Sequence, residues 1–163
     1  MPATIRWQRH VALTIAVLTA FVLAVSLLAA PSADAATKRQ RKIHSALQVA
    51  HNQKGDPYRY GANGPASFDC SGLVHFAFRR AGFRMPRTSG QQANRVRRIR
   101  KRNMRRGDLM FFHNGGRVYH VGIFTGWDGH RRRRVLHSPR PGSRVHVQKV
   151  WTRQWYAGTL RRR

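Results

Sequence analysis

The single cysteine of the chain lies in a sequence that suits a nucleophile. Cys70 follows Asp69, and apolar residues recur at helical spacing over 73–78. Asp69 can cap such a helix, which would put Cys70 in the first turn, where unpaired N–H groups and the positive end of the helix dipole favour a thiolate. The thiolate is the reactive form of cysteine. The alternative is a buried structural cysteine, which is a common role for this residue.

A cysteine nucleophile needs a base within hydrogen-bond reach and a third group that orients the base. Among the nine histidines, His120 and His137 each stand beside apolar, strand-like residues. Two adjacent antiparallel strands can bring such residues side by side on one face. We therefore predict that His120 is the base and that His137 holds its ring, although a purely structural role is also common for a histidine in a strand.

The elements that must position these residues follow from the hydrophobic pattern. We expect a first helix over 43–53, the Cys70 helix to end near Gly82, a short third helix over 86–96, and a solvated basic stretch over 95–106. Strand patterns then follow at 108–112, 118–124, 135–137 and 145–147. This order predicts an α+β fold, with N-terminal helices packed on an antiparallel β-sheet.

The N-terminal segment has the parts of a secretory signal. Two arginines in the first ten residues precede an apolar run over 11–30, and Ala33 and Ala35 form a small-x-small pattern. An uncleaved membrane anchor is the alternative, because the run is long enough to span a bilayer. The expected organisation is a signal peptide (1–36), a basic linker (37–42) and one domain (43–163). We expect membrane contact only through the signal segment.

If the chain is exported, a structural role for its single cysteine becomes less favoured, because secreted domains that use cysteine for stability carry it in pairs. A single thiol in an oxidising compartment is tolerated more readily if it is needed. This favours the nucleophile.

The charge of the chain is extreme, with 32 Lys and Arg against 5 acids, all of them Asp, and a formal net charge of +27. A basic surface implies polyanionic surroundings, such as nucleic acid, anionic lipid or an acidic wall polymer. The export signal and the lack of a readable recognition motif disfavour specific nucleic-acid binding. Composition alone does not choose between anionic lipid and wall polymers; the partners that we expect the charge to attract are anionic cell-wall polymers.

Three motifs carry a resemblance to a known family. Asp69-Cys70-Ser71-Gly72, His120-Val121-Gly122-Ile123 and Leu136-His137 resemble, in the same order, motifs of the NlpC/P60 peptidases of bacterial cell walls. The segments 57–61, 106–109 and 155–158 add supporting matches. The resemblance implies a papain-like α+β domain with Cys70 as the nucleophile, His120 as the base and His137 as the orienting residue. It implies neither a metal nor another cofactor.

The resemblance also implies a role for Tyr58, which matches a family tyrosine whose hydroxyl helps to polarise the scissile carbonyl. Packing of this loop tyrosine on the helix is the alternative. Asp69 is a helix cap rather than a catalytic group. Tyr119 departs from the family, in which a small residue commonly precedes the base, and would narrow the groove. A long stretch before His137 contains His130, which is an alternative orienting residue.

The implied activity is that of a secreted, cell-wall-associated peptidoglycan hydrolase, and we expect the protein to be a monomer. It would cleave stem peptides between D-glutamate (or D-isoglutamine) and the diamino acid through a thioester. The alternatives are an N-acetylmuramoyl-L-alanine amidase or another acyl transferase, and a catalytically idle basic module that binds wall polymer. A zinc site made of Cys70, His120 and His137 is a further alternative, although no HExxH or CxxC pattern supports it.

Overall fold

The computed structural model describes residues 33–161, which form three α-helices, a 3-10 turn and six strands. No helix in this range is long and apolar enough to cross a membrane. Most of the expected signal peptide lies outside the described residues, so it stays a prediction. The elements are α2 (Ala33–His51), α3 (Cys70–Arg80), α4 (Ser89–Arg95), β1 (Arg97–Ile99), η1 (Lys101–Asn103), β2 (Leu109–Asn114), β3 (Arg117–Trp127), β4 (Arg133–His137), β5 (His146–Lys149) and β6 (Trp155–Thr159).

Helix α3 begins and ends where the sequence predicts. The Asp69 side chain accepts a hydrogen bond from the backbone N–H of Gly72, which satisfies one free donor of the first turn. The helix ends at Arg80 with Ala81 as its C-cap, and Gly82 follows with a φ of +81°. That conformation suits glycine, because a side chain would be strained there. Helix α4 begins at a capping box between Thr88 and Gln91.

Helix α2 begins earlier than expected, at Ala33 instead of residue 43. Residues 37–42, which we expected to form a linker, are therefore helical. Their Lys, Arg and Gln side chains have good helix propensity, and the basic composition alone did not indicate this. The buried face of the helix begins at Ile43 and continues through Ala46, Leu47 and Ala50.

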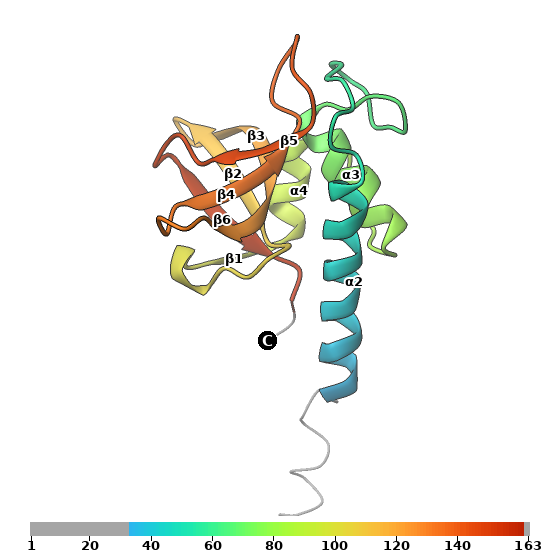
Figure 1. Cartoon of the computed structure of the whole chain (residues 1–163). Helices are drawn as coiled ribbons and strands as arrows, with labels where there is room; N and C mark the ends of the chain where they lie inside the picture. Colours follow the sequence, from blue (N-terminus) through green and yellow to red (C-terminus); the bar gives the residue numbers. More distant parts are fainter. Residues whose placement is uncertain (1–32, 162–163) are drawn as a thin grey trace, which may run out of the picture. The chain divides into compact units, whose positions relative to one another are not determined.

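The six strands form one antiparallel sheet in the order β1-β6-β2-β3-β4-β5, shown in Figure 1. Its central strands β2, β3 and β4 are paired in sequence, as the strand patterns predict. Two strands were not predicted, β6 and the short β1 inside the basic stretch. Because β1 has only three residues, it depends on pairing with β6, where Arg98 lies opposite Gly158.

The sheet is buried on both faces. Figure 1 shows the helices on one side of it. Their apolar faces share a core with side chains of one sheet face, including Phe111, Val121 and Ile123. A second cluster covers the other face, where Met104, which follows η1, packs with Phe112 and other strand residues. The α+β fold class predicted from the sequence is confirmed.

The start of α3 gives a test of close packing. A Cβ atom on Gly72 would lie 2.0 Å from the backbone oxygen of Ala62, so the loop would have to move. We expect Gly72→Ala to lower the free energy of unfolding by about 2 kcal/mol. Gly90 in α4 is the matched control, because its Cβ would meet nothing within 4 Å, and Gly90→Ala should raise stability by about 0.5–1 kcal/mol. Urea unfolding measures both, and equal effects would contradict this packing.

Candidate active site

The residues singled out from the sequence lie around one pocket of about 1290 Å³. Cys70 comes from the start of α3, His120 from β3 and His137 from the end of β4. Tyr58 comes from the loop that precedes α3, and Trp151 from the segment between β5 and β6. The structure therefore brings together residues from segments that are far apart in the chain.

Cys70 is the first residue of α3, and it is half-buried. Burial is the main cause of the raised pKa of its thiol, and the charge of Asp69 raises it further. The backbone N–H groups of Val121, Ser71 and Cys70 itself favour the thiolate, but they do not outweigh burial. This corrects the expectation that the helix start ionises the thiol: the resting Cys70 is neutral at pH 7.

Asp69 holds the start of α3 in place with more contacts than a helix cap needs. Its carboxylate accepts hydrogen bonds from the N–H groups of Gly61 and Gly72 and from the Ser71 hydroxyl. It also forms an ion pair with Arg87, whose Nη2 lies 2.5 Å from Oδ2. Burial alone would raise the pKa of Asp69, but the Arg87 and Gly72 hydrogen bonds outweigh it and hold the pKa below its ordinary value.

His120 and His137 contact each other through their ring nitrogens. Nε2 of His120 lies 2.8 Å from Nδ1 of His137, and both residues are buried. Since Nε2 of His120 is used in this contact, Nδ1 is the nitrogen available to a reacting group. His130, the alternative partner, lies instead in the exposed turn between β3 and β4.

Both rings are neutral in the resting protein. Burial lowers the pKa of His120 to about 4. The pKa of His137 falls to about 3, mainly through burial and also through the neighbouring His120 and His146, while the side chain of Gln148 opposes the shift. Among the described residues, Nε2 of His137 has no partner with hydrogen-bond geometry, and Oε1 of the nearby Gln148 contacts Nε2 of His146 at 2.9 Å.

An indole ring covers the histidine pair. Trp151 stacks on Phe112, with centroids 4.4 Å apart, and on His137 at 5.4 Å. Its centroid lies 5.8 Å from that of His120. Trp151 is itself 46% exposed and lines the pocket, so its ring contacts the histidine pair and also stays accessible from the pocket. Nothing in its sequence context indicated this position.

Tyr58 lies near the nucleophile, as its place in the motif predicts. An isolated bridge pairs Tyr58 with Phe68, two residues before Cys70. Burial, followed by the negative charges of Cys70 and Asp69 in their ionised forms, raises the pKa of the Tyr58 hydroxyl, which is therefore a proton donor at neutral pH. Tyr119 lines the same pocket and is half-exposed.

Three polar residues that were not singled out from the sequence hold the site together. The buried Ser138 hydroxyl donates to the carbonyl of Phe68 at 2.7 Å, which joins the end of β4 to the approach to Cys70. The Gln92 side chain donates to the carbonyls of Ser71 and Pro86. Arg87 binds Asp69. Of these three residues, only Ser138 has a position in the sequence that points to the site, because it directly follows the predicted His137.

Within the described range, no three His, Cys, Asp or Glu side chains are placed to hold a metal ion. The groups that converge on the pocket include the Cys70 thiol, the neutral imidazoles of His120 and His137, and the Tyr58 phenol. Together they can accept and return a proton at a sulfur nucleophile, which is what acyl transfer requires.

The comparisons with known proteins agree with this geometry. The sequence pattern of the NlpC/P60 family matches residues 55–163. The protein named probable endopeptidase p60 of Listeria monocytogenes is 45% identical over 80 residues, which cover 48% of this chain and 16% of that protein. Murein DD-endopeptidase MepH of Escherichia coli is 32% identical over 145 residues, covering 81% of this chain and 52% of that protein.

The fold agrees as well. The peptidoglycan hydrolase RipB of Mycobacterium tuberculosis superposes with a TM-score of 0.67 at 27% identity, covering 82% of this chain and 70% of that one. The chain spans about half or less of the length of the two curated relatives. The match nevertheless runs through both histidine strands and the cysteine helix. This chain therefore belongs to the NlpC/P60 family of peptidase domains.

Proposed function

We propose that the protein is a cysteine endopeptidase that cleaves an amide bond in the stem peptides of peptidoglycan. The observation that carries this proposal is the meeting of Cys70 with the hydrogen-bonded His120–His137 pair in one pocket of an NlpC/P60 domain. The preferred bond is the one between D-glutamate or D-isoglutamine and the diamino acid. Because the name of MepH specifies a DD-endopeptidase, the cross-link is the competing bond.

The reaction begins from a neutral thiol and a neutral imidazole. As the Cys70 sulfur attacks the amide carbon, its proton passes to Nδ1 of His120 and the carbonyl electrons move onto oxygen. The tetrahedral intermediate collapses with cleavage of the C–N bond, and His120 returns the proton to the leaving amine, leaving a thioester. Water, deprotonated by His120, then hydrolyses the thioester and restores the thiol.

His137 and two donors assist these steps. His137 keeps the His120 ring oriented through the 2.8 Å contact, so that Nδ1 is directed to the reacting groups. The backbone N–H of Cys70, at the first helical position, is available to the developing oxyanion. The Tyr58 hydroxyl, whose raised pKa keeps it protonated, supplies a second donor.

We also propose that the protein acts outside the cytoplasm, as its cell-wall relatives imply. Its net charge of +27 should retain it on anionic wall polymers, and this retention should weaken with salt. An amidase acting at the sugar–peptide junction would use the same Cys-His chemistry. The new termini of the products distinguish it from an endopeptidase.

The thiol mechanism is tested with Cys70→Ala. We expect release of stem-peptide fragments from purified peptidoglycan to fall by about 10⁴-fold or more, because the nucleophile is gone, while sedimentation with peptidoglycan is retained. Mass spectrometry of the wild-type products identifies the bond that is cut. Addition of EDTA is the control for a metal site and should leave the rate unchanged. Full activity of Cys70→Ala would contradict the proposal.

The pH profile tests the buried histidine. His120 accepts a proton only when neutral, and its pKa is about 4, so kcat/KM should fall only as the pH drops toward 4. The pKa of Cys70 is raised above 9.0, the ordinary pKa of a cysteine thiol. Because iodoacetamide reacts with the thiolate, we expect the rate of alkylation to keep increasing as the pH rises above 9.0. A soluble muropeptide is the substrate.

The fold must be followed at each pH in the same experiment. In the unfolded chain, both histidines have a pKa near 6.5, which is higher than their pKa in the folded protein. Protonation therefore favours the unfolded chain, and the stability of the fold declines as the pH falls below 6.5. Circular dichroism separates this loss from the kinetic effect. An acid limb of kcat/KM centred near pH 6.5 in a folded protein would contradict a buried, neutral base.

His137 and His130 form a matched pair of variants. His137→Ala should lower kcat by about 10- to 100-fold with little change in KM, because the base loses the group that orients its ring. His130→Ala should leave both constants unchanged, since His130 lies in an exposed turn. The reverse result would assign the orienting role to His130.

A further inference from the structure

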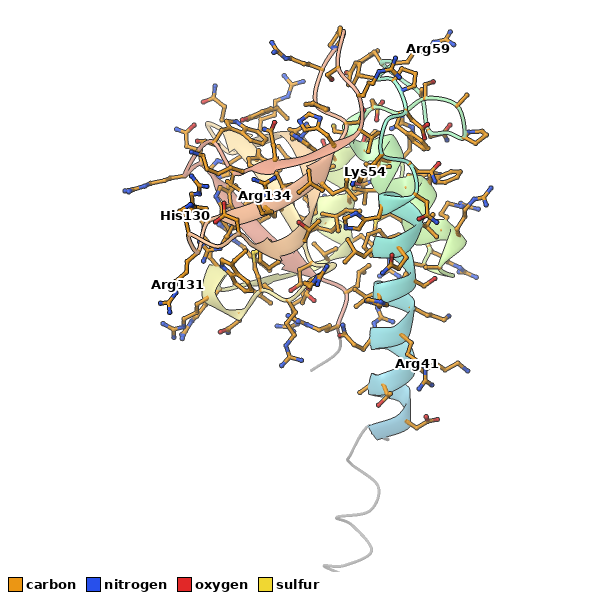
Figure 2. All side chains as sticks on the ribbon, in the orientation of Figure 1. Arg41, Lys54, Arg59, His130, Arg131 and Arg134 are labelled. Carbon is orange, nitrogen blue, oxygen red and sulfur yellow. The ribbon has the colours of Figure 1, made fainter. Side chains whose placement is uncertain are left out.

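A second feature lies away from the active-site pocket. Figure 1 shows β1 and the segment after it at the lower end of the sheet, whereas the loop that follows His137 lies at the upper end. Figure 2 shows the Arg131 side chain extending outward near that lower end. Cationic side chains gather around η1, where they form two groups.

The first group lines a pocket of about 490 Å³. Its cations are Arg97, Arg102, Arg105 and Arg161. Arg161 forms an ion pair with Asp108 at 2.9 Å, and its Nη2 also donates to the carbonyl of Asn103. Burial lowers the pKa of Arg161, and the charges of Arg105 and Arg97 lower it further, although Asp108 opposes them. These guanidinium groups are therefore close enough to repel one another.

The second group surrounds Lys101. Burial lowers the pKa of Lys101, and the charges of Arg133, Arg153 and Arg98 add to the shift. Its Nζ lies 4.2 Å from the centroid of the Trp155 ring and donates to the carbonyl of Arg153 at 3.0 Å. Among the described residues, the ion pairs formed by carboxylates involve Arg87, Arg132 and Arg161 and do not include Lys101.

Three of the five acids of the chain already have cationic partners. Asp108 is 2% exposed, and it already binds Thr159, the Arg105 amide and Arg161. Asp69 pairs with Arg87 in the active site, and Asp128 pairs with Arg132 in the β3–β4 turn. Crowded cations of this kind are stabilised when an external anion supplies the missing negative charge.

We propose that this surface binds a flexible phosphodiester polymer. We call it the η1 cation patch, and it comprises Arg97, Arg98, Lys101, Arg102, Arg105, Arg133 and Arg153. Five of these side chains are exposed and two are half-buried, so a chain of phosphates can lie across η1 and contact both groups. The inference rests on the proposed retention by anionic wall polymers and is independent of the peptidase chemistry.

The aromatic residues of the patch favour this polymer over nucleic acid. Trp155 is buried beneath Lys101 and Arg133, and Arg98 covers the ring of Tyr156. Single-stranded nucleic acids bind to successive exposed rings. The rings that contact patch cations are instead the buried Trp155 and the half-buried Tyr156, and the exposed ring of Trp151 is stacked on Phe112 and His137. Trp127, opposite Arg133, is left as a single half-exposed ring. Met104 is buried, so it cannot insert into a lipid surface.

The test uses a labelled poly(glycerol phosphate) chain and the variant Arg97→Gln/Arg102→Gln/Arg105→Gln. Affinity at 0.1 M salt should fall about tenfold or more, and the slope of log K against log salt should decrease by about 2 for three lost phosphate contacts. The control Arg41→Gln/Arg79→Gln/Arg84→Gln removes the same charge from exposed helical and loop positions and should change affinity less than about twofold. Hydrolysis of a soluble muropeptide should be unchanged in both.

Three outcomes would overturn the proposal. If both triple variants lost the same affinity for poly(glycerol phosphate), the binding would depend on the net charge of the protein and not on the η1 cation patch. Tighter, patch-dependent binding of a single-stranded DNA oligonucleotide would assign the patch to nucleic acid, and tighter binding of phosphatidylglycerol vesicles would assign it to lipid. If the triple variant fails to fold, the single variant Arg102→Gln is measured in the same way. Since muropeptide hydrolysis is read separately, failure here leaves the endopeptidase proposal intact.

Discussion

The carboxylate of Asp69 is the interaction on which the site depends. It receives donors from the loop at Gly61, from the first turn of α3 at Ser71 and Gly72, and from Arg87 before α4. Three segments therefore meet at one buried charge. Because Arg87 keeps that charge paired and the pKa low, the N-terminus of α3 cannot shift without leaving a buried carboxylate unsatisfied. Cys70, the next residue, is positioned by the same constraint.

Burial decides the protonation states that the chemistry starts from. The helix start and nearby amides favour a thiolate at Cys70, but burial outweighs them. The same burial, reinforced by the Trp151 ring, keeps His120 and His137 neutral. A neutral thiol beside a neutral imidazole implies that proton transfer accompanies attack on the substrate instead of preceding it. Such a resting state also protects the thiol from oxidation, because the thiolate is the form that oxidants attack.

Three of the few acids of the chain pair with individual cations at separate places in the fold. Beside Cys70, the Asp69 carboxylate pairs with Arg87, while Arg117 and Arg140 also line the pocket. At η1, the cations outnumber the single buried Asp108. Figure 1 shows β1 and the segment after it at the opposite end of the sheet from the loop that follows His137. A polymer bound at η1, as proposed, would therefore leave the catalytic pocket free.

The sequence by itself determined the family, the α+β class, the bounds of α3, and which cysteine and histidines come together. These features depend on local signals, namely a cap, a periodicity and short motifs in a fixed order. Only the tertiary structure revealed β1, which needs β6 for its hydrogen bonds, and the roles of Arg87 and Trp151. It also decided the protonation state of Cys70. Burial and long-range pairing join residues that are far apart in the chain, and no local pattern records such contacts.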